Sequence, residues 1–212
     1  MSLEIFNKFS HSSCSFSKPE KNETTYHSSM MKNNQPVFIQ MPKLRTINGL
    51  HWHDNRCYLD LELTKPALNF FLDFEKNNIQ TVSQNSTNWF GKDMPRDIID
   101  SNYLSIVRLD SNKSYVRFSI PVNGDECGIN VYNQFKERVT PDDIIPGMDV
   151  WVILRCKGLV VGKRNLCFEW SVEQIKMHTK SGNPYMFIED EDVEIMENPF
   201  SDEKHFEEYL QG

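Results

Sequence analysis

Residues 150–177, VWVILRCKGLVVGKRNLCFEWSVEQIKM, are the part of the sequence that decides the fold. Over 150–157 the side chains fall alternately on two sides of an extended chain, with Trp151, Ile153 and Arg155 on one side. After GKRN at 162–165 a second alternation, of apolar and polar residues, runs over 166–175. A period of two is typical of a β-strand, and Gly and Asn are typical of a turn. The stretch therefore predicts a β-hairpin with a basic tip, in which Gly158 marks a bend or a bulge.

Shorter strand patterns precede this hairpin. CYLDLEL at 57–63 alternates leucines with acidic residues, and SYVRFSIPV at 114–122 repeats the same period. Shorter apolar runs, VFIQM at 37–41 and CGINVYNQF at 127–135, add two further strands. In FFLDFE at 70–75 the apolar residues also alternate, and this run too predicts a strand.

Two segments between the strands have helical features. Residues 79–90 show helix-like apolar spacing interrupted by polar residues, and Gly91 is placed to end such a helix. A second helix is predicted to run to about Tyr103, with Asp93 as its N-cap and Pro95 in its first turn.

The balance of these elements indicates the fold class. About seven short strands with one or two helices, and no regular alternation of strand and helix, favour an antiparallel barrel or sandwich. We predict a mainly β fold, an antiparallel Greek-key barrel of OB type with a helical elaboration over 79–105. The domain is expected to span residues 37–187.

The two ends of the chain differ from this central part. Residues 1–36 are rich in serine and lack a sustained apolar period, so they predict a disordered polar arm. Residues 188–212 carry ten acidic side chains and one basic side chain, Lys204, and are predicted to form a flexible acidic tail with a net charge of −9. The formal charge of the 212-residue chain is −7, which leaves +2 on residues 1–187. A nucleic-acid partner is therefore compatible with the central part.

Several protein classes are not expected. No run approaches the roughly 20 apolar residues of a membrane span, and the N-terminus does not resemble a secretory signal, which predicts a cytosolic or nuclear protein. Five cysteines without a CxxC pair are typical of reduced thiols. His51, His53 and Cys57 are three potential zinc ligands without a nearby fourth, and two surface histidines explain them more simply. We expect no enzyme, no metal and no cofactor.

Aromatic and basic residues interleaved on the strands indicate a binding function. Aromatic side chains that stack on bases, beside a basic groove that follows the phosphates, are how proteins bind single strands without sequence preference. Phe118, Trp151 and Phe168 are expected in the core instead, whereas for Tyr115 and Trp89 burial and exposure are equally compatible with the sequence. The sequence does not distinguish single-stranded DNA from RNA as the partner, and the predicted nucleic-acid-binding residues are Trp89, Lys92, Tyr115, Arg117, Arg155, Lys157, Lys163 and Arg164.

The acidic tail suggests a second role. A flexible acidic segment with apolar punctuation can compete with nucleic acid for a basic groove and can recruit partner proteins. A merely solvated tail would leave its apolar residues without a role. The predicted partner-binding residues are Ile195, Pro199, Phe200 and Phe206.

A family resemblance supports this interpretation. The succession of NSTNWFGK, SNYLSIVRL, SYVRFSIPV and the final hairpin resembles the OB-fold-like single-stranded-DNA-binding proteins of large nucleocytoplasmic DNA viruses, over about residues 37–177. The resemblance implies a cofactor-free protein of an infected cell that coats exposed strands in replication, repair or recombination. It further implies replication or recombination proteins as partners, and it allows a homo-oligomer.

An alternative remains open at this point. The protein could be a viral interaction module, a virion or host-modulating β-sandwich without affinity for nucleic acid, whose apolar tail residues dock on a partner. A metal-dependent enzyme using His51, His53 and Cys57 is a third reading, and it requires stoichiometric metal.

Overall fold

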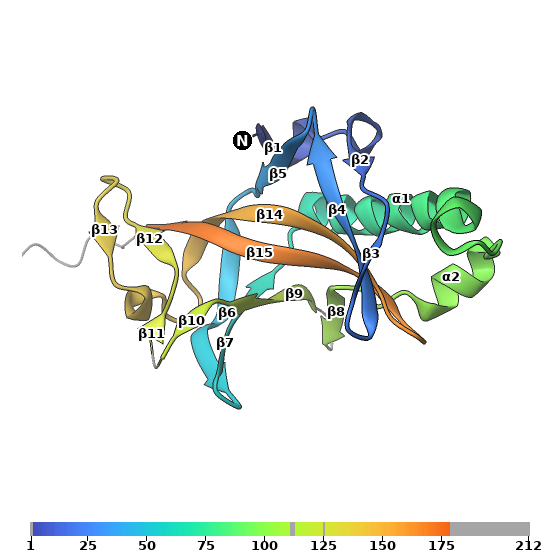
Figure 1. The fold of residues 1–212 in the computed structure, drawn as a ribbon. Coiled ribbons are helices and arrows are strands. Elements are labelled where there is room, and N and C mark those ends of the chain that lie inside the picture. Colours follow the sequence, from blue (N-terminus) through green and yellow to red (C-terminus); the bar gives the residue numbers. More distant parts are fainter. Residues whose placement is uncertain (1, 111–112, 125, 179–212) are drawn as a thin grey trace, which may run out of the picture. The chain divides into compact units, whose positions relative to one another are not determined.

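A curved antiparallel sheet forms the centre of the computed structural model, which describes residues 2–110, 113–124 and 126–178 (Figure 1). β6 (Leu44–His53) pairs with β7 (Arg56–Glu62), and β7 pairs with β9 (Lys113–Ile120). β14 (Asp149–Val161) pairs with β6 at its start and with β15 (Leu166–Met177) along its length.

The sheet curls so that β15 approaches β9. β15 pairs in parallel with β12 (Asn130–Tyr132), which follows β9 in the chain. Within the described residues no ladder joins β9 itself to β15, so the barrel is partly open, as is common for the OB type. The prediction of a mainly β, antiparallel fold of OB type with a helical elaboration is confirmed. β7 and β9 occupy the positions of the second and third strands of an OB barrel.

The predicted strand at 70–75 is wrong, because these residues belong to α1 (Lys65–Phe90). The buried face of α1 repeats every three or four residues, from Ala67 through Phe71, Phe74 and Asn78 to Val82. Three polar side chains, Glu75, Asn78 and Ser86, occupy inward positions, and the apolar Leu72 is exposed, so the apolar residues alone do not show the helical period.

The helix boundaries agree largely with the prediction. Gly91 ends α1 with a φ of +67°, as expected of a left-handed C-terminal residue. α2 (Arg96–Asn102) lies within the predicted second helix, but its N-cap position is held by Pro95 and not by Asp93. Figure 1 shows α2 beside the C-terminal part of α1.

The predicted disorder of residues 1–36 is wrong for residues 2–36, which contain strands and two short 3-10 helices. β4 (Thr25–Lys32) and β5 (Gln35–Gln40) both pair with β14, so the N-terminal segment completes an edge of the sheet. Widely spaced aromatic residues, among them Phe6 and Phe9, pack against Phe70 of α1. Long-range pairing therefore orders a segment whose own sequence has no apolar period.

The remaining elements are short. They are β1 (Ser2–Ile5), η1 (Phe6–Lys8), η2 (His11–Ser13), β2 (Ser15–Phe16), β3 (Glu20–Asn22), β8 (Val107–Asp110), β10 (Val122–Asn123), β11 (Glu126–Cys127), β13 (Arg138–Val139) and η3 (Pro141–Asp143). No described helix is both long and apolar enough to cross a membrane.

The predicted hairpin of β14 and β15 is confirmed, with its bulge at Gly158. Gly158 has a φ of +144°, and a Cβ at this position would collide with the carbonyl oxygen of Ser28 on β4. At this point β14 exchanges its edge partner from β5 to β4. The glycine thus permits the close approach by which the N-terminal segment joins the barrel.

Aromatic rings fill the space between the barrel and α1. Phe74 of α1 lies 4.7 Å, between ring centroids, from both Phe168 and Trp170 of β15. Phe118 and Phe168 are buried, as predicted for core residues. This packing fixes α1 against β15, and the ring of Phe71 of α1 lies 6.5 Å from that of Phe118 on β9, one of the strands that carry the candidate site.

Candidate nucleic-acid interface

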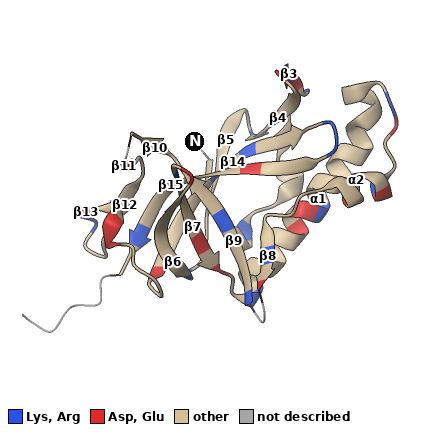
Figure 2. Cartoon of the chain, turned by 90° about the horizontal axis from the view of Figure 1, so that it is seen from below, with Lys and Arg blue, Asp and Glu red and all other residues tan. Residues whose placement is uncertain are grey.

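The outer face of β7 and β9, called the β7–β9 face below, carries the first candidate site. In the OB type the second and third strands form the surface that binds oligonucleotides. The register places Asp60 opposite Arg117, with Tyr58 two positions before Asp60 on β7 and Tyr115 two positions before Arg117 on β9. Figure 2 shows a basic segment of β9 next to an acidic segment of β7. Residues that alternate with the buried leucines of β7 and with Phe118 therefore share one outward surface.

A bidentate ion pair holds the centre of this face. Arg117 donates from Nε and from an Nη atom to the two carboxylate oxygens of Asp60, each over 2.7 Å. Asp60 is 2% exposed, and its hydrogen bonds with the guanidinium raise the pKa of Arg117. The guanidinium carbon also lies 5.5 Å from the ring centroid of Tyr58. Arg117 is therefore positioned beside an aromatic ring before any ligand arrives.

His51 adds an unpaired polar atom to the same face. Its Nε2 lies 3.6 Å from the carboxylate of Asp60, and its ring centroid lies 6.0 Å from that of Tyr58. The Nδ1 atom is buried and has no hydrogen-bond partner among the described residues. Unsatisfied buried polar atoms are uncommon, so this nitrogen distinguishes the centre of the face from the rest of the sheet.

The basic residues predicted on the final hairpin lie on a different part of the barrel. We call Arg155, Lys157, Lys163 and Arg164 the basic hairpin set; Arg155 and Lys157 are exposed on β14, and the other two form the tip beyond it. Lys157 forms an ion pair with Glu169 over 2.8 Å. The sequence therefore predicted as one site residues that lie in separate groups on the barrel.

Trp89 and Lys92 form a third group at the end of α1. Trp89 is half-buried, and its ring lies 6.5 Å from that of Phe16 and 6.2 Å from that of Phe90. It thus helps to pack the N-terminal segment against the helix. Lys92 follows Gly91 and is exposed. A role for either residue in binding stays a prediction.

Comparison with known protein families assigns the chain to one of them. Residues 48–189 match the model of a family of unknown function, DUF5871. The chain belongs to this family. The DUF5871 match begins within β6, so it includes the β7–β9 face and the final hairpin but not β1–β5. A search of curated proteins found no significant match.

Solved structures of two phage proteins are similar to this DUF5871 member at low identity. A single-stranded DNA-binding protein from bacteriophage Enc34 is 11% identical, with 84% of this chain and 98% of that chain covered and a TM-score of 0.43. The same phage protein has been solved in complex with ssDNA, with a TM-score of 0.43 and 80% of this chain and 98% of that chain covered. The single-stranded DNA-binding protein gp2.5 of bacteriophage T7 is 8% identical, with 72% of this chain and 97% of that chain covered and a TM-score of 0.43.

The prediction that Trp151 lies in the core is wrong. Trp151 is half-exposed on the outer side of β14, where Lys176 of β15 lies against its ring. A signal was present in the sequence, because Trp151 shares its strand face with Arg155, which was predicted to be exposed. Tyr58 and His51 were also missed, since only their neighbours across the sheet reveal them. The predicted tail residues, from Ile195 to Phe206, lie outside the described residues.

The three potential zinc ligands do not form a site. Cys57 is buried, and its Sγ lies 2.7 Å from Sγ of Cys127, while His53 is exposed beside Asp54. His51 faces outward on β6, toward Asp60. Within the described residues no group of three His, Cys, Asp or Glu side chains could hold a metal ion.

Proposed function

We propose that this DUF5871 protein binds single-stranded DNA, without catalysis, across its β7–β9 face. The observation that carries the proposal is the arrangement of Tyr58, Arg117 and Asp60, in which a buried carboxylate holds a guanidinium beside a half-buried aromatic ring. Flat aromatic and guanidinium groups stack on bases of any sequence, and a positive charge attracts the phosphates.

Charge supports the same function. The ion pairs of Arg117 with Asp60 and of Lys113 with Glu62 neutralise two acidic groups of the face. Arg56 and Arg108, at the margins of the face, are exposed, and Arg108 lies opposite Tyr115 in the ladder of β8 and β9. Phosphates would thus meet basic groups at the edges of an aromatic centre.

The finer role rests on the family resemblance in the sequence. We include in the proposal that the protein coats exposed strands during viral DNA replication, repair or recombination, and that residues 188–212 recruit partner proteins. The basic hairpin set, Trp89 and Lys92 would extend the contact with DNA beyond the β7–β9 face.

Fluorescence anisotropy with a labelled oligo-dT, compared with a duplex of equal length, tests the proposal. We expect the single strand to bind more tightly at low salt and to dissociate as salt rises. Tyr115→Ala should weaken binding about 5- to 150-fold, the equivalent of roughly 1–3 kcal/mol per stacked base. Tyr26→Ala is the matched control, because Tyr26 is a 39% exposed tyrosine on β4.

Two results would oppose the proposal in different ways. If neither the full chain nor a 1–187 truncation binds oligo-dT at low salt, the interaction-module reading gains and the proposed function fails. If the chain binds but Tyr115→Ala and Tyr26→Ala have equal, small effects, the DNA lies elsewhere on the barrel.

A further inference from the structure

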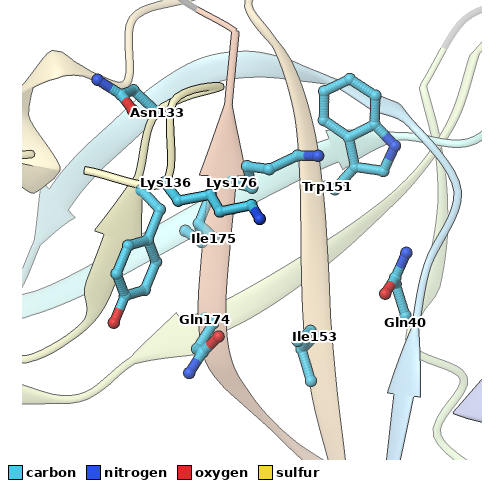
Figure 3. A pocket seen from close by; sticks show the side chains of 9 residues that line it. Gln40, Asn133, Lys136, Trp151, Ile153, Gln174, Ile175 and Lys176 are labelled. Carbon is cyan, nitrogen blue, oxygen red and sulfur yellow. The ribbon is translucent and has the colours of Figure 1, made fainter. Parts of the chain in front are cut away.

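A groove lies on the outer side of β12, β14 and β15, away from the β7–β9 face. We call it the Trp151 groove; its cavity volume is about 350 Å³, at the small end of the range of ligand sites. Figure 3 shows Lys136 crossing over β15 and Lys176 extending from β15 toward Trp151 of β14. The lining residues used below are Gln40, Tyr132, Lys136, Trp151, Gln174 and Lys176.

The strand register builds the groove as a row across three strands. Tyr132 of β12 lies opposite Lys176 of β15, which in turn lies opposite Trp151 of β14. Nζ of Lys176 is 4.6 Å from the centroid of the Trp151 ring. A basic group thus stands between two aromatic residues, on three hydrogen-bonded strands that hold it in place.

The second lysine is carried by an ordered turn. The side-chain oxygen of Asn133 accepts hydrogen bonds from the backbone N–H groups of Phe135, over 2.9 Å, and of Glu137, over 3.0 Å. Asn133 is 8% exposed, so these bonds are shielded from water. They fix the turn between β12 and β13, and therefore the position of Lys136.

The chemistry of the lining favours an anionic, flat ligand. Lys136 and Lys176 supply two positive charges, and among the described residues no acidic side chain lines the cavity. Gln40 and Gln174 supply amide groups, which can both donate to and accept from the edge of a base. The strands of the groove already pair with neighbours on both sides, so a peptide could not add to them as another strand.

We propose that the Trp151 groove is a second subsite for single-stranded nucleic acid, which holds one nucleotide with its base against Trp151 and its phosphates at Lys136 and Lys176. The proposal rests on the proposed function, and it assigns a site on the fourth and fifth strands of the barrel rather than on the second and third. Because β9 lies against β15, one strand of DNA can continue from the β7–β9 face across β15 to the groove.

The experiment compares Lys136→Gln/Lys176→Gln with Lys18→Gln/Lys21→Gln, a control that removes the same charge from two exposed lysines of the N-terminal segment. Affinity for a series of oligo-dT lengths is measured at several salt concentrations. For long oligomers, we expect the groove variant to reduce the salt slope by about 1.4, from about 0.7 per lost phosphate contact on a single strand. The control pair should leave the slope unchanged.

Trp151 is tested with two variants. Trp151→Ala should weaken binding of long oligomers about 5- to 150-fold, as expected for the loss of one stacked base, while Trp151→Phe should restore most of it. Photocrosslinking of an iodouracil oligomer, mapped by mass spectrometry, should place the crosslink on Trp151 or Tyr132. Near-UV circular dichroism of each variant verifies that the barrel is folded.

The outcomes separate this inference from the proposed function. Absence of oligo-dT binding by the unmodified chain refutes both. Normal binding and an unchanged salt slope in the groove variants, with losses confined to Tyr115→Ala, refute the groove and leave the β7–β9 face intact. Loss of binding to a glutamate-rich peptide, with DNA binding unchanged, would show that the groove serves an acidic peptide and would also overturn the inference.

Discussion

Loss of the ion pair of Arg117 and Asp60 is predicted to lower the free energy of unfolding strongly. Arg117→Met removes both hydrogen bonds that the 2% exposed carboxylate of Asp60 receives from the guanidinium. Removing one partner of a buried pair costs about 3–5 kcal/mol, because the remaining charge is left without compensation. The side chain of Arg117 is itself 30% exposed, which places the expected loss in the lower part of that range, at about 3 kcal/mol.

Urea unfolding followed by circular dichroism measures this loss. With a slope of about 2 kcal/mol per molar urea, a loss of about 3 kcal/mol lowers the midpoint by roughly 1.5 M. The double variant Asp60→Asn/Arg117→Met removes the uncompensated charge, so it should be more stable than Arg117→Met alone by more than about 1 kcal/mol. Equal stability of the two variants, or a cost below about 1 kcal/mol for Arg117→Met, would refute the reasoning that Asp60 depends on Arg117.

Three further predictions concern other parts of the chain. His11 hydrogen-bonds to Asn78 over 3.0 Å, and its burial lowers its pKa below the ordinary value of 6.5. The folded state therefore prefers the neutral ring, so the free energy of unfolding should fall as the pH drops below about 6.5. Thermal melts at pH 7.5 and 5.5 should show a smaller difference for His11→Gln than for the parent chain. Gly158→Ala should destabilise the fold by more than about 2 kcal/mol in urea unfolding, because its Cβ meets the backbone of β4, whereas Gly124→Ala, in open space, should cost about 1 kcal/mol. Replacing the basic hairpin set with glutamine should reduce the salt slope of oligo-dT binding by up to about 2.8, and an unchanged slope would remove these residues from the interface.

The features that were predicted correctly depend on interactions between residues close in sequence. The hairpin of β14 and β15, the strand β7 and the C-terminal end of α1 at Gly91 depend on neighbours close in sequence, and each was predicted. α1 was misread at its start because Phe70, Leu72 and Phe74 alternate although Leu72 is 47% exposed, and because the polar residues Glu75 and Asn78 take inward positions, where they bond to groups outside the helix. Asn78 bonds to His11 and Tyr103, and Ser86 accepts from the backbone of Met94.

The candidate site was predicted only in part, for a related reason. Tyr115 and Arg117 stood out as an aromatic and a basic residue on one strand face, but their partners come from β7, more than fifty positions earlier. The role of Tyr58 and the ion pair of Asp60 follow from the register of β7 against β9, which no local pattern encodes. An aromatic residue in an apolar strand, such as Trp151, is expected in the core. Only the packing of the sheet decides which side of that strand is covered.

The sequence by itself determined the fold class, the basic hairpin and the alternation that gives each strand an inner and an outer side. These features follow from local periodicity and turn chemistry, which act between residues a few positions apart. Only the tertiary structure decided that residues 2–36 complete the sheet, that Trp151 faces outward and that Asp60 holds Arg117. These outcomes depend on strand pairing between distant segments, because hydrogen bonds and burial across a barrel are set by register and by which face is covered.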